Sequence, residues 1–102
     1  MGAPIELKPS LQLLRVTKVF MDAKGYRATG ADVMRTTKLP SGTIYPMLAR
    51  METAGWVRSE WEQVDPAEVG RPRKRFYFLT GLGQRAANST LANFGFVMRP
   101  VS

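Results

Sequence analysis

The chain has 102 residues, a mass of 11.4 kDa and a formal net charge of +7, because 15 Lys and Arg residues outnumber eight Asp and Glu residues. This length is typical of one domain with one modest core, and the positive charge suits a polyanionic partner. The sequence contains no Cys and no His, which excludes a disulfide framework, a thiol nucleophile, a zinc finger and a His-dependent triad. We therefore expect no enzyme, no catalytic residue, no metal site and no cofactor.

The sequence also lacks the features of a membrane or exported protein. No apolar run approaches the roughly 20 residues that span a bilayer. The N-terminus has no basic segment followed by an apolar one, as a signal peptide would have. The absence of Cys fits a reducing compartment. We expect a cytoplasmic, nucleoid-associated protein with no membrane partner.

The first part of the chain predicts two helices. Helical periodicity over residues 10–24 predicts the first helix, and Gly25 ends it. An extended connector over residues 26–28 follows. Thr29 is then placed to cap a second, short helix over residues 30–37.

A third helix is predicted over residues 41–54, with Ser41 as its cap and Gly55 as its terminator. Pro46 lies just beyond the helix positions whose N–H groups are free in any case, so it removes one helical hydrogen bond. We expect a local kink or a later start of the helix at this residue. The turn before this helix is short, which predicts a helix-turn-helix pair.

The next segment predicts two strands. Residues 57–62 alternate with period two, which places Val57 and Trp61 on the buried face and the charged residues on the other. The aromatic run over residues 75–79 predicts the second strand. The polar segment between the strands is too long for a tight turn, so we expect a hairpin with an extended tip.

Thr80 is placed to cap a final helix over residues 82–92. Three helices followed by a hairpin are typical of the winged helix-turn-helix, an α+β fold. We therefore predict a three-helix core, a β-hairpin wing and a C-terminal dimerisation helix. The corresponding division is an N-terminal extension over residues 1–9, a DNA-binding domain over 10–80, and a dimerisation helix with its tail over 81–102.

Residue types at the third helix and at the hairpin tip suit double-stranded DNA. In this fold the start of the third helix contacts base edges in the major groove, and the hairpin follows the backbone toward the minor groove. Hydroxyl-bearing and basic side chains occur at both places. The candidate DNA contacts are Thr37, Lys38, Ser41, Thr43, Tyr45 and Arg50 near the helix, and Arg71, Arg73, Lys74 and Arg75 in the wing.

An ordered series of motifs resembles the PadR family of bacterial and phage transcriptional regulators. It comprises SGTIYPMLARME over residues 41–52, AGWV over 54–57, GRPRK over 70–74 and YFLT over 77–80. The resemblance implies a homodimeric repressor that binds an inverted-repeat operator and occludes a promoter. It places at DNA the residues Ser41, Gly42, Thr43, Tyr45, Arg50, Arg71, Arg73 and Lys74.

The chain also departs from the family pattern. The sequence after Thr80 reads Gly-Leu-Gly, where the family commonly has acidic residues, and the length indicates the short type without a separate effector domain. Some relatives bind flat aromatic drugs between tryptophans at the dimer interface. Because Trp56 and Trp61 lie in or beside the hairpin, we transfer no ligand site, and an unknown small-molecule effector is left open.

The apolar C-terminal tail has two interpretations. It either folds back on its own core or forms a seam between two subunits with the first and last helices. We favour the seam, because a small winged domain has little core left to offer. The candidate interface residues are Leu13, Phe20, Leu91, Phe94 and Phe96.

Two other functions stay open. A winged-helix protein-interaction module would dock its basic face on an acidic partner. A basic RNA-binding protein would stack bases on the aromatic residues 76–78, although a two-stranded hairpin needs one face to cover the helices. The acidic run over residues 60–68 lacks the ligand order of a calcium loop, so strand alternation explains it better.

Overall fold

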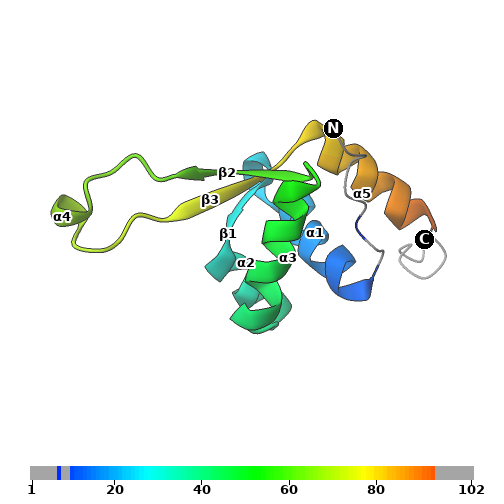
Figure 1. The fold of residues 1–102 in the computed structure, drawn as a ribbon, viewed down its shortest axis with the longest axis horizontal. Helices are drawn as coiled ribbons and strands as arrows, with labels where there is room; N and C mark the ends of the chain where they lie inside the picture. The colour runs from blue at the N-terminus through cyan, green and yellow to red at the C-terminus, as the bar shows by residue number, and fades with distance from the viewer. Residues whose placement is uncertain (1–6, 8–9, 94–102) are drawn as a thin grey trace.

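The computed structural model describes residue 7 and residues 10–93, and it has an α+β fold (Figure 1). Within these residues, five α-helices, one short 3₁₀ helix and three strands follow one another. The helices are α1 (Leu11–Asp22), α2 (Gly30–Thr37), α3 (Ser41–Thr53), α4 (Pro66–Val69) and α5 (Gly81–Asn93), with the 3₁₀ helix at Lys24–Tyr26. The strands are β1 (Arg27–Thr29), β2 (Val57–Trp61) and β3 (Arg75–Leu79).

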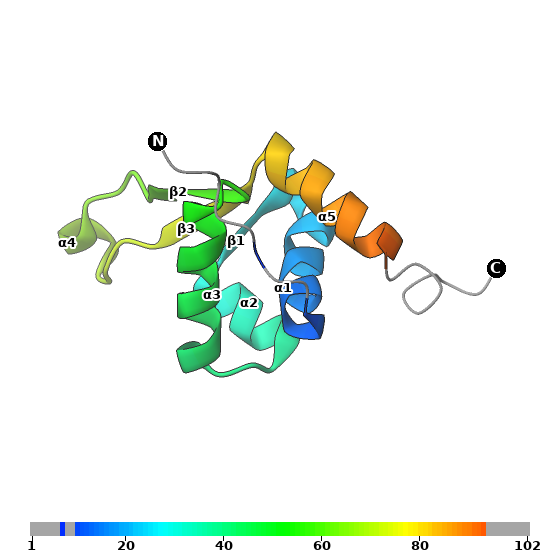
Figure 2. The same ribbon diagram turned by 45° about the vertical axis from the view of Figure 1, so that its right-hand side comes forward.

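Helices α1, α2 and α3 form one body, and the β2–β3 hairpin extends away from it as a long arm (Figures 1 and 2). The arm carries α4 at its tip, while α5 packs against α1 at the other end of the molecule. This is the predicted winged helix-turn-helix with its wing.

The predicted cap of the second helix is confirmed. The Thr29 hydroxyl accepts a hydrogen bond from the Asp32 backbone N–H at 3.1 Å, and the Asp32 carboxylate accepts one from the Thr29 N–H at 3.0 Å. This reciprocal pair is a capping box, which uses two N–H groups that would otherwise lack partners. The Thr29 N–H, together with Arg35, holds the pKa of Asp32 below its ordinary value.

The start of α3 differs from the prediction. Pro40 is the N-cap and Ser41 is the first helical residue, because the Pro40 carbonyl accepts from the N–H groups of Thr43 and Ile44. The fixed φ and extended ψ of Pro40 suit a residue that precedes a helix. The helix then continues through Pro46 as a single element, so the later start expected there is wrong.

The sheet has three strands rather than the two of a simple hairpin. The connector predicted over residues 26–28 is extended from Arg27 on, where it forms β1, and only Tyr26 belongs to the 3₁₀ helix. Strand β1 pairs antiparallel with β3, in the order β1-β3-β2. Arg27 lies opposite Phe78, and Thr29 lies opposite Phe76. The reason is physical: an isolated hairpin is marginally stable, and β1 supplies partners for the other edge of β3.

The core lies between the helices and the inner face of the sheet. Its fully buried side chains include Val16, Phe20, Val33, Ile44, Leu48 and Met51. Leu13 and Phe20 are 3% and 0% exposed in the single chain and belong to this cluster. They therefore have no surface to offer a second subunit, and their assignment to the interface is corrected. Phe94 and Phe96, and the side chain of Leu91, lie outside the described residues.

Helix α5 begins as predicted, at a cap formed by Thr80. The Thr80 hydroxyl accepts from the Gly83 N–H at 2.9 Å and donates to the Gly55 carbonyl at 2.6 Å. The first turn of α5 thereby contacts the turn between α3 and β2. Gly83 lies so close to that turn that any side chain there would overlap the Trp56 carbonyl.

Candidate nucleic-acid interface

The exposed side of α3 presents most of the predicted contacts. Ser41, Gly42, Tyr45 and Arg50 are exposed, and Thr43 is partly exposed. The opposite side of the helix packs into the core through Ile44, Met47, Leu48 and Met51. A polar outer side backed by an apolar inner side leaves the start of α3 free to enter a groove of DNA.

One predicted contact belongs to the interior instead. Thr37 is 3% exposed, and its hydroxyl donates to the Val33 carbonyl at 2.7 Å and accepts from the Leu39 N–H at 3.2 Å. Its polar atoms are therefore used within the turn, so Thr37 is a structural residue rather than a DNA contact. Lys38, the next residue, is exposed and ends α2 with a positive φ of 63°.

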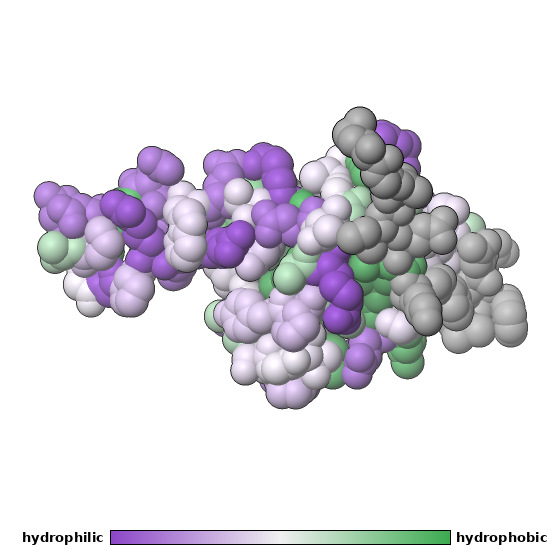
Figure 3. Space-filling model, viewed as in Figure 1, coloured by the Kyte–Doolittle hydropathy of each residue, from purple (hydrophilic) through white to green (hydrophobic). Residues whose placement is uncertain are grey.

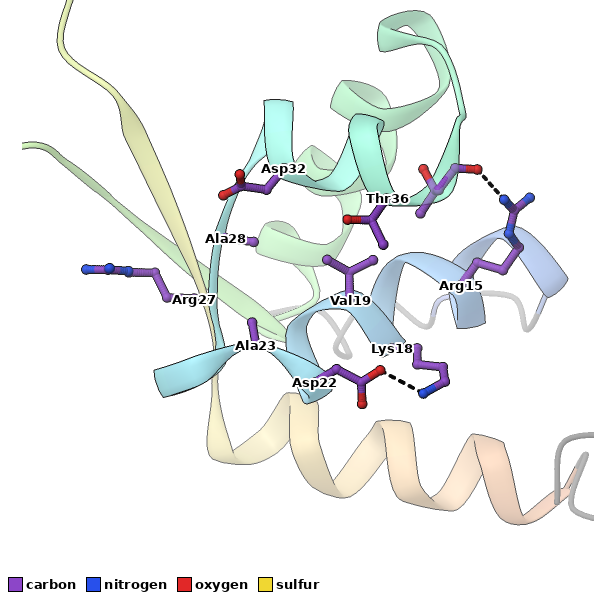
Figure 4. Close-up of a pocket in the computed structure, with 10 residues that line it drawn as sticks. Arg15, Lys18, Val19, Asp22, Ala23, Arg27, Ala28, Asp32 and Thr36 are labelled. Atoms are coloured by element: carbon purple, nitrogen blue, oxygen red, sulfur yellow. Dashed lines mark hydrogen bonds and ion pairs between the residues drawn. The ribbon is translucent and has the colours of Figure 1, made fainter. Parts of the chain in front are cut away.

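The turn between α2 and α3 is held from outside by α1. The Arg15 guanidinium donates to the Thr37 carbonyl, one of the carbonyls without a partner at the end of α2 (Figure 4). It lines a cleft of about 490 Å³ between α1, α2 and β1. Beside it, Lys18 and Asp22 pair with each other at 2.7 Å. Arg15, Lys18 and Asp22 therefore have partners within the protein. A small-molecule effector stays a prediction.

The acidic and basic runs of the wing bind each other. Arg71 donates to both carboxylate oxygens of Glu62 at 2.7 and 3.0 Å, and the Lys74 backbone N–H donates to Glu62 at 3.1 Å. These hydrogen bonds, that from Arg71 first, lower the pKa of Glu62 to about 2. Arg73 Nε donates to the Val64 carbonyl at 2.8 Å. Part of the basic run therefore shapes the wing.

Acid should weaken the hydrogen bonds that Arg71 and the Lys74 backbone make to Glu62. A lowered pKa means that the Glu62 carboxylate stabilises the folded wing fully above its ordinary pKa of 4.5, and that this contribution is lost as the pH falls toward about 2. We expect the Lys74 amide signal in NMR spectra to shift over that range, and its protection against hydrogen exchange, relative to an unstructured amide at the same pH, to fall. In Glu62→Gln the same change should be present already at neutral pH. A Lys74 amide that does not respond between pH 5 and 2 would contradict the assignment.

Arg75 connects the wing to α3. Its guanidinium donates to the Ser59 hydroxyl at 2.8 Å and lies 3.3 Å from the Glu52 carboxylate, to which Ser59 also donates at 2.7 Å. Glu52 is on α3, Ser59 on β2 and Arg75 on β3. This triad, the wing joint, ties the direction of the wing to the direction of α3.

Trp61 lies in the open, contrary to the prediction from strand alternation. It is 56% exposed, whereas Val57 on the same strand is buried. Trp61, at the end of β2, lines an open groove, so alternation correctly gives the face of the strand but not the burial of this side chain.

The aromatic run of β3 has two faces. Tyr77 points into the core, where burial raises its pKa. Phe76 and Phe78 lie on the other face, each beneath a guanidinium, that of Arg27 at 4.8 Å and that of Arg58 at 4.2 Å from the ring centre. Of the three, only Tyr77 packs in the core, and the arginines cover the faces on which RNA bases would stack.

The wing, the start of α2 and Tyr45 of α3 enclose a groove of about 510 Å³, which we call the wing–helix groove. It brings together the exposed Tyr45 of α3 and the basic residues at the base of the wing. Polar and charged residues cover much of the wing (Figure 3). The groove is lined by Thr29, Gly30, Ala31, Asp32, Arg35, Tyr45, Trp61, Arg73, Lys74, Arg75 and Tyr77.

The described part of the chain offers neither a metal site nor a membrane span. No cluster of three or more acidic side chains that could hold a metal ion occurs there. Within the same residues, none of the helices combines the length and the apolar character needed to cross a bilayer.

Comparison with known proteins gives a family and a fold. Residues 26–89 match the profile of the transcriptional regulator PadR-like family. The fold is similar to that of a PadR family transcription regulator from hypervirulent Clostridium difficile R20291, with a TM-score of 0.71, 18% identity, and coverage of 86% of this chain and 91% of that one. It is also similar to smu.1704 from Streptococcus mutans UA159, with a TM-score of 0.67, 22% identity, and coverage of 90% and 86%.

A third similar structure contains DNA. AbfR, a protein known from Staphylococcus epidermidis, has been solved in an overoxidized form bound to DNA, and it is 25% identical with a TM-score of 0.62. The match covers 86% of this chain but only 58% of AbfR. No protein of curated function matches the sequence.

Proposed function

The chain belongs to the PadR-like family of transcriptional regulators, and we propose that it is a homodimeric repressor that binds an inverted-repeat operator in double-stranded DNA. One observation carries the proposal: the exposed Tyr45 of α3 and the wing cations Arg73, Lys74 and Arg75 line the same groove, the wing–helix groove. A protein that reads base edges with α3 and holds the backbone with its wing needs both on one side. The similar protein AbfR has been solved bound to DNA, which supports a DNA-binding role for this chain.

In this mechanism the start of α3 enters the major groove. Ser41, Thr43 and Tyr45 supply hydroxyls for base edges and phosphates, while Gly42 permits close approach of the backbone. Lys38 and Arg50 contact phosphates on either side. The wing then lies along the neighbouring backbone, and a bound dimer blocks a promoter in the cytoplasm, at the nucleoid.

The subunit contact is proposed for α5 and the segment that follows it. The division into an extension over residues 1–9, a DNA-binding domain over 10–80 and a dimerisation region over 81–102 follows from this role. Leu91, Phe94 and Phe96 supply apolar side chains for the seam. Two-fold symmetry of the dimer would then match the two-fold symmetry of the operator.

Selection of bound duplexes from a random DNA pool, at two salt concentrations, tests the function. We expect a palindromic consensus at both concentrations, since half-site symmetry mirrors protein symmetry. Recovery of no preferred sequence, with binding that vanishes at physiological salt, would leave only a basic protein that binds polyanions. RNA competition stronger than duplex competition would favour the RNA-binding alternative instead.

The wing cations should set the salt dependence of binding. Each phosphate contact contributes about 0.9 to the slope of log affinity against log salt concentration. The double variant Arg73→Gln with Lys74→Gln should therefore lower that slope by about 2 and weaken binding to operator and unrelated duplexes alike. Fluorescence anisotropy titrations of labelled duplexes at four salt concentrations measure both effects.

Arg75→Gln is the matched control, because it removes one more cation from the same basic run. Its guanidinium is bound to Glu52 and Ser59, so we expect the slope to stay unchanged. The preference for operator over unrelated duplex should fall instead, since the wing joint sets the wing's direction. A slope loss for Arg75→Gln half as large as that of the double variant would make Arg75 a phosphate contact, as the sequence predicted.

A further inference from the structure

Two large aromatic side chains stand exposed in the wing–helix groove. Tyr45 is 46% exposed and Trp61 is 56% exposed. Tyr45 lies against Gly30 at the start of α2, where an added Cβ would come within 2.6 Å of the Tyr45 ring. Trp56, the other tryptophan, is 9% exposed and belongs to the core. The groove therefore has two aromatic side chains, Tyr45 and Trp61, whose surfaces are only partly covered by the protein.

The charge of the groove is positive. Arg35, Arg73, Arg75 and Lys74 line it, and the carboxylate that faces them is Asp32. Both oxygens of that carboxylate are occupied, one by the Thr29 N–H and the other by Arg35. Within the described residues, the Lys74 ammonium group has no hydrogen bond or ion pair. A phosphate that enters the groove would thus meet cations and a neutralised acid.

The position of the groove indicates what occupies it. In the proposed complex α3 lies in the major groove of DNA and the wing lies at the adjacent minor groove. One sugar–phosphate backbone separates these two grooves, so that strand must pass between α3 and the wing. Deoxyribose offers apolar C–H surface and phosphate offers negative charge, which match the aromatic walls and the cations of the wing–helix groove.

We propose that the wing–helix groove seats the backbone of one strand of duplex DNA, with Trp61 packed against a deoxyribose and Lys74 beside the adjoining phosphate. This inference rests on the proposed function and adds to it a contact residue outside the predicted set. Because the contact is to backbone, it contributes affinity without sequence preference. Arg75, 5.6 Å from the Trp61 ring, holds the indole in place for this contact.

Tryptophan fluorescence tests the contact directly. The two tryptophans differ in exposure, so acrylamide quenches mainly Trp61 in the free protein. We expect a selected operator duplex to lower the quenching constant at least twofold. In Trp61→Phe, which leaves only the buried Trp56, the duplex should change the quenching constant little. Duplex binding without any decrease for the unaltered protein would overturn the inference.

Affinity measurements give an independent readout. Trp61→Ala should weaken binding to operator and unrelated duplexes by the same factor, about tenfold, because it removes aromatic surface buried against sugar. Val69→Ala is the matched control, since Val69 is an exposed apolar residue of the wing outside the groove. Equal affinities for Trp61→Ala and Val69→Ala, with duplex still bound, would overturn this inference alone. Failure of the unaltered protein to bind any duplex would overturn the proposed function.

Discussion

Replacing Phe20 by Ala should lower the free energy of unfolding by about 3–5 kcal/mol, because it empties the centre of the core. Phe20 is fully buried among side chains of α1, α3 and the sheet. A domain of this size has a total stability of about 5–15 kcal/mol, so the variant should be partly unfolded at 37 °C. Urea unfolding followed by circular dichroism at several protein concentrations measures the loss.

Leu11→Ala is the control on the same helix. Leu11 is exposed, so its truncation should change the stability by no more than about 0.5 kcal/mol. The Phe20 variant also shows whether this residue is part of the core or part of a subunit interface. A folded but monomeric Phe20→Ala protein, in place of a destabilised one, would return Phe20 to the subunit interface that the sequence predicted.

Gly83→Ala should cost about 3 kcal/mol of stability, since the new methyl group would overlap backbone atoms. Its Cβ would lie 2.1 Å from the Trp56 carbonyl oxygen and 2.8 Å from Leu79 Cδ1. The Trp56 carbonyl cannot move aside easily, because it also accepts from the Thr80 N–H at 2.9 Å. Relief therefore requires α5 to lift away from the turn between α3 and β2.

Gly81→Ala provides the comparison within the same helical turn. An added Cβ there would lie 3.4 Å from Arg85 Nη1, the end of a flexible side chain. Helix propensity should make this variant neutral or more stable by up to about 1 kcal/mol. Thermal unfolding of both variants checks the contrast. Equal stabilities for the two would mean that α5 does not approach the turn as closely as described.

Local signals in the sequence were sufficient for α1, α2, α3, α5 and the two strands of the hairpin. Thr29 and Thr80 cap helices because a hydroxyl one residue before a helix has free N–H groups within reach, and that rule needs no tertiary contact. The same logic failed at Ser41. Two residues compete for the cap there, and Pro40, with its extended backbone, takes the position.

Burial was harder to predict than secondary structure. Periodicity shows which side of an element is apolar, but not what covers that side. Phe20 and Trp61 illustrate both errors: the first is covered by its own chain, and the second lies on the correct face of its strand but lines an open groove. Strand β1 could not be predicted for a related reason, because a three-residue strand exists only through its pairing with β3.

Among the predicted DNA contacts, too, some positions could be predicted from the sequence and others could not. Exposed positions on α3 followed from the fold, because one side of that helix must face the core. Which wing cations are free could not be predicted in this way, because Arg71 and Arg75 have carboxylate partners that are distant in sequence. A count of positive charges overstates how many are free to meet phosphates. The pairing of Glu62 with Arg71, nine residues apart, depends on the shape of the loop around α4.

The central place of β3 in the sheet has a mechanical consequence. Hydrogen bonds to β1 and β2 hold it on both sides, so we expect this strand to resist bending. One end continues into the wing, and the other continues through Thr80 into α5. We therefore expect a tilt of α5 to be passed along β3 to the wing. In the proposed dimer, a change at the subunit contact would thus alter the spacing of the two wings and so the operator that fits between them.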